Sequence, residues 1–189
     1  MKATFDLDGV LIDTTAVICH RLGIDYEKID VYSIAGNKSL SERQKSDIFK
    51  LFGDPSVYWK AANRDAFRAL NTLAEKCEIT IHSFCNDKLI ARVKREICEQ
   101  YAPNVKNIVT ELVGHVDRDK DIEVTDVLVE DRFDTLVSEY NDYKYGIMIR
   151  QPYNREIDLD IYPKIEAYDD IVDAIEVLDK ACESGEWDR

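Results

Sequence analysis

Two aspartates near the N-terminus, Asp6 and Asp8, are the residues best placed in the sequence to do chemistry. Residues 2–7 contain the apolar side chains of Ala3, Phe5 and Leu7 and predict a short strand buried on both faces. Side chains two apart on a strand point the same way, so both carboxylates face one place. Gly9 then lets the backbone turn close to a ligand. Two carboxylates at the end of a buried strand are costly unless a cation or a substrate uses them. The pattern therefore predicts that both are catalytic, whereas the Asp-x-Asp pairs within 117–121 and 158–160 lie in polar stretches.

Two further predicted strands also end in polar groups. Ser83 ends an apolar stretch at 78–83, and the acidic pair Glu130-Asp131 ends another at 126–131. Adjacent side chains on a strand face opposite ways, so a turn at the strand end must aim both acids at one site. Oxygen ligands of this kind suit Mg²⁺.

The elements that must position these residues alternate between strands and helices. Apolar spacing predicts strands at 2–7, 78–83, 108–110, 126–131 and 145–149, and helices at 14–23, 41–51, 63–76, 87–100, 133–140 and from 171 onward. This order predicts an α/β fold with a parallel sheet and helices on both faces, whose active groups gather at the carboxyl ends of the strands. We divide the chain into a core of residues 1–15 and 61–189 and a small helical cap of residues 16–60, inserted after the first strand.

Charge and composition exclude several classes of partner. The 189-residue chain has a formal net charge of −13, which opposes binding to nucleic-acid polymers and anionic membranes. A site for a small phosphate must therefore supply its own positive field, from a divalent metal and one or two lysines. There is no apolar run of about 18 residues, so no membrane span is expected.

The cysteines and the N-terminus bear on the cellular setting. The five cysteines form no Cys-x-x-Cys pair, and their number is odd, which argues against a disulfide framework and against a zinc site. The N-terminus has no charged-then-apolar leader pattern. We therefore expect a reducing, cytoplasmic setting.

The run Asp6-Leu7-Asp8-Gly9-Val10-Leu11 resembles the first motif of the haloacid dehalogenase (HAD) superfamily. The resemblance implies that Asp6 is a nucleophile that forms an aspartyl-phosphate and that Asp8 is the general acid and base. Ser83 corresponds to the second motif, with Phe84 beside it at the phosphate. The acidic pair corresponds to the fourth motif, which implies an Mg²⁺ site made by Asp6, the Asp8 carbonyl and Asp131, with Glu130 further out.

Within this superfamily, the sequence is similar to the 5′(3′)-deoxyribonucleotidases. The similarity rests on residues 127–132, 118–120, 58–59 and 151–155. Two lysines, Lys88 and Lys120, compete for the phosphate-binding position. The resemblance favours Lys88, which opens the helix after the second motif, and makes Arg118 a second basic group near the site. The segment His82-Ser83-Phe84-Cys85 departs from the family's Thr-Ser-Pro, and the loop before Lys88 is shorter, so the substrate contacts of this loop do not carry over.

The sequence favours an Mg²⁺-dependent phosphomonoesterase that acts on nucleoside monophosphates. Aromatic residues of the cap, Tyr58 and Trp59 among them, are expected to stack on a nucleobase. A phosphatase for a sugar phosphate or another small metabolite is the alternative, and a non-catalytic HAD-fold binding protein is a further one. A dehalogenase is disfavoured by the resemblance, because the second aspartate of the motif is a phosphatase-type feature. The oligomeric state stays open, with a homodimer among the states considered.

Overall fold

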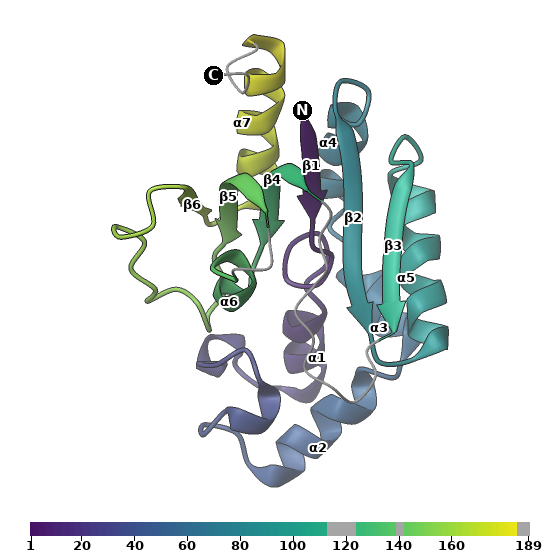
Figure 1. The fold of residues 1–189 in the computed structure, drawn as a ribbon. Coiled ribbons are helices and arrows are strands. Elements are labelled where there is room, and N and C mark those ends of the chain that lie inside the picture. Colours follow the sequence, from purple (N-terminus) through teal and green to yellow (C-terminus); the bar gives the residue numbers. More distant parts are fainter. Residues whose placement is uncertain (113–123, 139–141, 185–189) are drawn as a thin grey trace.

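The computed structural model describes residues 1–112, 124–138 and 142–184, and its centre is a six-stranded parallel sheet (Figure 1). The strand order is β3-β2-β1-β4-β5-β6, so β1 lies between β2 and β4. The strands are β1 (Lys2–Phe5), β2 (Glu78–Cys85), β3 (Asn107–Leu112), β4 (Thr125–Glu130), β5 (Tyr143–Ile149) and β6 (Ile165–Tyr168). The predicted α/β fold with a parallel sheet is confirmed. Strand β6 was not predicted.

Apolar side chains cover both faces of the sheet around β4 and β5. In β4, Val127 and Val129 join the larger core, while Leu128 belongs to a smaller cluster with Leu136 and Met148. Alternate side chains of a strand point to opposite faces, so the two clusters lie on opposite sides of the sheet. Burial on both faces explains why these strands read as continuous apolar runs in the sequence.

The described residues also form seven helices, whose buried side chains complete the core. They are α1 (Thr14–Leu22), α2 (Glu42–Leu51), α3 (Pro55–Ala61), α4 (Arg64–Leu73), α5 (Lys88–Tyr101), α6 (Phe133–Leu136) and α7 (Ile171–Ser184). Side chains cap several N-termini, as Asn63 does for α4 and Asp87 for α5. Ser41 forms a capping box with Gln44 at the start of α2.

Helices α1, α2 and α3 lie at the carboxyl ends of the strands, below the sheet in Figure 1. The short 3₁₀ turns Tyr26–Lys28 and Ile34–Gly36 belong to the same stretch of chain. This helical segment therefore lies at the carboxyl ends of the strands, where the sequence predicted the active groups. The exact division into a core and a cap of residues 16–60 stays a prediction.

One disulfide corrects the sequence-based expectation for the cysteines. Cys77, just before β2, is joined to Cys182 of α7, across 105 residues of chain. Spacing along the sequence gave no hint of this pair, because only the packing of α7 beside α4 brings the two residues together. The other three cysteines, Cys19, Cys85 and Cys98, are free and buried. Among the described residues, no helix has the length and apolar character that crossing a membrane requires.

Candidate active site

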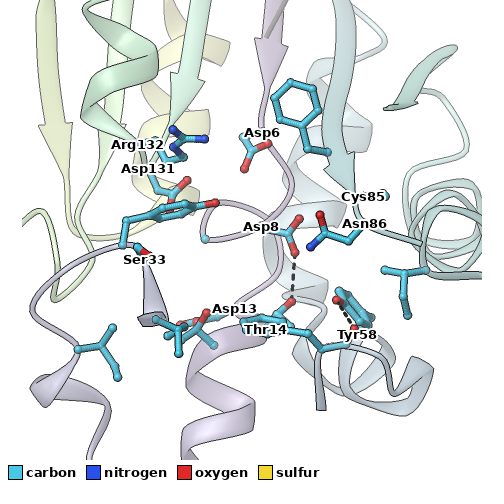
Figure 2. Close-up of a pocket in the computed structure, with 18 of the residues that line it drawn as sticks. Asp6, Asp8, Asp13, Thr14, Ser33, Tyr58, Cys85, Asn86, Asp131 and Arg132 are labelled. Carbon is cyan, nitrogen blue, oxygen red and sulfur yellow. Dashed lines mark hydrogen bonds between the residues drawn. The ribbon is translucent and has the colours of Figure 1, made fainter. Parts of the chain in front are cut away.

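The end of β1 delivers two carboxylates into one site. The backbone N–H of Asp6 donates to the carbonyl of Val129 at 2.9 Å, which ties the end of β1 to β4. The chain then turns through Gly9, whose φ is 75°. Asp6 lies on the β1 side of the site and Asp8 lies below it, toward Thr14 (Figure 2). Both residues lie beyond the last residue of β1, and both line the same cavity.

A buried lysine, Lys94, joins Asp8 to Ser83. The ammonium of Lys94 donates to Asp8 Oδ2, to Ser83 Oγ at 3.0 Å and to the carbonyl of Phe84 at 2.8 Å. Ser83 Oγ also donates to Asp8 Oδ2 at 3.1 Å, and Thr14 donates to Asp8 Oδ1 at 3.3 Å. Both oxygens of Asp8 are therefore held in place, and all three donors of the ammonium have a partner.

Neighbouring carboxylates stabilise the protonated form of Lys94. Burial alone would lower the pKa of the Lys94 ammonium, but the negative charges of Asp8 and Asp6 outweigh it and raise the pKa above its ordinary value. Lys94 is therefore a permanent cation inside the site. A phosphate placed here meets a fixed positive charge although the chain as a whole is strongly acidic.

The structure places Lys94, and not Lys88, beside Asp8 and Ser83. Lys88 is the first residue of α5 and is exposed, outside the cavity that Lys94 lines. The geometry does not favour Lys88 as the phosphate-binding lysine, since its side chain starts about 1.7 helical turns before the position that reaches Asp8. Arg118 and Lys120, the other predicted basic residues, lie outside the described residues.

The sequence contains a signal that points to Lys94. Lys94 stands next to Val93, four residues after Ile90 and three before Ile97, so it falls within the apolar stripe of α5. All four of these residues are buried. A lysine on the inner face of an amphipathic helix is rarely tolerated without an acidic partner, which points to a buried carboxylate nearby.

An acidic group suitable for a metal lies beside Asp6. Oxygen atoms of Asp6, Glu130 and Asp131 lie within 4.8 Å of one another, and all three residues are buried. Glu130 Oε1 accepts from the backbone N–H groups of Asp131 and Arg132 at 3.1 and 3.2 Å. Glu130 thus holds the turn after β4, which lets two adjacent acids approach one site as the sequence analysis required.

The donor set of this group fits Mg²⁺. Asp131 Oδ1 is buried and has no hydrogen-bond partner among the described residues, a costly state unless a cation is bound. Burial, followed by the charges of Glu130 and Asp6, raises the pKa of Asp131 well above its ordinary value. Carboxylate oxygens are the ligands that Mg²⁺ prefers. The residues that would hold the ion are Asp6 and Asp131, with Glu130 shaping the turn.

The side chain of Asp8 lies outside the acidic group that would hold the metal. Its side chain is committed to Lys94, Ser83 and Thr14 and does not join the acidic group. Coordination through the backbone carbonyl of Asp8 stays a prediction.

The Lys94–Asp8 pair and the acidic residues Asp6 and Asp131 line a single cavity of about 1110 Å³, which lies between the strand ends and the helical segment. Its aromatic lining includes Tyr32, Phe49, Phe52, Tyr58 and Phe84. Tyr58 lies where the sequence predicted a substrate contact, and its hydroxyl donates to the carbonyl of Phe52 at 2.8 Å. Trp59 is not part of this lining and instead packs edge-on against Tyr101, with 6.1 Å between ring centroids. The geometry does not favour the predicted contact of Trp59 with a substrate in this cavity, because neighbouring helical residues face different directions.

Comparison with known proteins identifies the fold. No family model matches the sequence, and no curated protein matches it. A solved structure from Burkholderia xenovorans LB400, named as a haloacid dehalogenase-like hydrolase, is similar with a TM-score of 0.53 and 13% identity, covering 98% of this chain and 97% of that chain. A haloacid dehalogenase-like family hydrolase from Xanthomonas campestris gives a TM-score of 0.48 and 12% identity, covering 97% of this chain and 98% of that chain. The first likeness shows that this chain has the fold of the HAD-like hydrolases.

Replacing Gly9 with alanine is expected to destabilise the protein more than replacing Gly23. Both glycines have positive φ, 75° and 66°, so both variants carry the backbone cost of about 1–2 kcal/mol for a residue with a side chain. A Cβ at Gly9 would also lie 2.7 Å from Asp131 Cγ and 2.9 Å from the Tyr153 hydroxyl, whereas a Cβ at Gly23 meets nothing within 4 Å. Chemical denaturation of Gly9→Ala and Gly23→Ala measures the difference, and equal losses would contradict the packing described around Gly9.

Proposed function

We propose that the protein is an Mg²⁺-dependent phosphomonoesterase that works through an aspartyl-phosphate on Asp6. The observation that carries this proposal is the buried contact of Lys94 with Asp8 and Ser83, placed beside the acidic group of Asp6 and Asp131. A nucleophile, an acid–base group, a cation and a hydroxyl donor then converge on one cavity, which is the set that phosphoryl transfer requires.

The proposed reaction has two displacements at phosphorus. A carboxylate oxygen of Asp6 forms a bond to phosphorus while the bond to the leaving alcohol breaks, and the departing oxygen takes a proton from Asp8. In the proposed step Asp8 carries this proton in the substrate complex, where Lys94 has turned from Asp8 to the phosphate. Water then attacks the phosphorus of the aspartyl-phosphate and passes a proton to Asp8. Inorganic phosphate leaves, and Asp6 is restored.

Fixed groups of the chain support the charge of the phosphoryl group. In this proposal Lys94 and the hydroxyl of Ser83, which both bond to Asp8 in the structure, turn to the phosphate oxygens, and Thr14 orients Asp8. A divalent ion, when bound at Asp6 and Asp131, supplies charge neutralisation at the phosphate oxygens. Because these groups are held by the fold, little reorganisation is needed during the reaction.

We infer that the substrate is a nucleoside monophosphate, in the manner of the 5′(3′)-deoxyribonucleotidases. The cavity of about 1110 Å³ is slightly larger than the usual range for small-molecule sites, roughly 300–1000 Å³. A nucleobase that stacks on one of its aromatic rings gains about 1–3 kcal/mol. That gain corresponds to a preference of about ten- to a hundredfold over a substrate without a ring to stack.

Asp6→Asn is expected to abolish turnover while the fold is retained. An amide is isosteric with the carboxylate but lacks the nucleophilic oxygen, and losing a nucleophile costs about 10⁴-fold or more in rate. Phosphate release from p-nitrophenyl phosphate in Mg²⁺ measures activity, and circular dichroism checks the fold. Near-normal turnover by a folded Asp6→Asn protein would refute the aspartyl-phosphate.

Lys94→Met is expected to lower kcat/KM by about 10²–10³-fold, the usual loss when one fixed donor to a developing charge is removed. Lys88→Met is the matched control on the same helix, and its kcat/KM should stay within about twofold of wild type. Binding of inorganic phosphate, followed by calorimetry, should weaken in the first variant only. A larger effect at Lys88 would show that the phosphate lies elsewhere.

A panel of substrates tests the identity of the leaving group. Deoxyuridine and thymidine monophosphates should be hydrolysed at least about tenfold faster, by kcat/KM, than glucose 6-phosphate or phosphoglycolate. The ribonucleotides and the 3′-monophosphates belong in the same assay. If the non-nucleotides are hydrolysed equally well or better, the protein is a phosphatase for a sugar phosphate or another small metabolite.

A further inference from the structure

The two carboxylate oxygens of Asp131 have different surroundings. The hydroxyl of Tyr153 donates a hydrogen bond to Oδ2. Oδ1 is buried and has no hydrogen-bond partner among the described residues. Tyr153 comes from the loop that follows β5, outside all the elements that supply the proposed catalytic groups. One oxygen is thus occupied by the protein, and the other remains for a cation.

We propose that Tyr153 makes Asp131 a one-oxygen ligand and thereby gives the metal site its preference for Mg²⁺ over Ca²⁺. The inference rests on the metal site of the proposed function and adds a selectivity to it. Tyr153 is a positioning residue here, since it acts through Asp131 and does not touch the ion.

The reason lies in how the two ions use carboxylates. Mg²⁺ requires an octahedron of six oxygens at about 2.0–2.1 Å and takes one oxygen from each carboxylate. Ca²⁺ is larger, accepts about six to eight oxygens and readily binds both oxygens of one carboxylate. A hydrogen bond that occupies Oδ2 removes the second oxygen from use. The loss falls on Ca²⁺, because Mg²⁺ does not need that oxygen.

The loop holds the Tyr153 hydroxyl against Asp131 through several bonds. Asn154 is buried, and its amide donates to the carbonyl of Asp131 at 2.7 Å and to that of Ile149 at 2.9 Å. The side chain of Gln151 donates to the carbonyl of Gly9 at 2.7 Å. The loop is therefore tied both to the turn after β4 and to the turn after β1, the two turns that carry Asp131 and Asp6.

Contacts from the helical segment close the other side of this loop. The hydroxyl of Tyr26 donates to Gln151 Oε1 at 2.9 Å, and the ring of Tyr32 packs edge-on against Tyr153 with 5.6 Å between centroids. At Gly9, a Cβ would come within 2.9 Å of the Tyr153 hydroxyl, so the hydroxyl fills the space that the glycine leaves. Tyr153 therefore has little freedom to rotate away from Asp131. The proposed selectivity requires this, because the hydroxyl must stay on Oδ2 to keep that oxygen from binding Ca²⁺.

The test compares Mg²⁺ and Ca²⁺ binding to wild type and Tyr153→Phe by isothermal titration calorimetry. Phenylalanine keeps the ring but frees Oδ2. We expect the ratio of the Ca²⁺ Kd to the Mg²⁺ Kd to fall by about tenfold or more, since loss of a group that orients a ligand changes metal affinity by about 10–100-fold. Tyr143→Phe is the matched control: its hydroxyl donates to the carbonyl of Leu136, away from the acidic group, so its ratio should equal that of wild type.

Two further variants make the result decisive. Asp131→Asn should lose binding of both ions, which locates the measured site. Gln151→Leu breaks the tie to Gly9 without touching Asp131, and it should shift the ratio in the same direction as Tyr153→Phe; if Tyr153→Phe does not fold, this variant decides. An unchanged ratio in a folded Tyr153→Phe, or a wild type that binds neither ion, would overturn the inference. Phosphatase activity of the wild type is measured separately, so the proposed function stands or falls on its own assay.

Discussion

The contact between the Lys94 ammonium and the Asp8 carboxylate is the interaction on which the rest of the site depends. A lysine whose side chain is 4% exposed is costly unless a carboxylate balances it. Removing one member of a fully buried pair costs about 3–5 kcal/mol. The cost here is smaller, because 33% of the Asp8 side chain is exposed. The pair also ties α5 to the turn after β1, and Ser83 of β2 bonds to both partners. Three separate elements thereby meet at one point.

The parallel sheet explains why these groups meet at all. With β1 between β2 and β4, the carboxyl ends of three adjacent strands bring Asp6, Ser83 and Asp131 to one edge. The same arrangement places carboxylates close together, which burial and mutual repulsion oppose, as the raised pKa of Asp131 records. The fold tolerates this group because the hydrogen bonds of Glu130, Tyr153 and Asn154 hold the turn after β4 in place. A bound cation would relieve the repulsion, so metal binding and stability are linked at this edge.

The helical segment takes part in the site through its contacts with the loop after β5 and with the turn after β4. Tyr26 bonds to Gln151, Arg155 forms an exposed ion pair with Glu27, and Arg132 lies over the ring of Tyr32 with its guanidinium carbon 4.7 Å from the centroid. The ion pair is exposed on both sides and adds little stability by itself. The hydrogen bond and the ring contacts are closer to the cavity and define one of its walls. Residues that line the cavity thus come from the helical segment as well as from the ends of the strands.

The sequence by itself determined the strand-end chemistry: Asp6, Asp8, Ser83 and the acidic pair at 130–131 each follow an apolar strand, and parallel strands bring their ends together. Periodicity also located most helices, because one buried face leaves a local pattern. The apolar stripe of α5 already marks Lys94 as a buried lysine, whereas the tertiary structure decided that its partner is Asp8, since that depends on how α5 is rotated against the sheet. The tertiary structure also decided the position of the edge strand β6 and the pairing of Cys77 with Cys182. It likewise decided that Trp59 packs against Tyr101 and that Tyr153 contacts Asp131. Each of these depends on residues distant in the chain, and such contacts leave no periodic trace in the sequence.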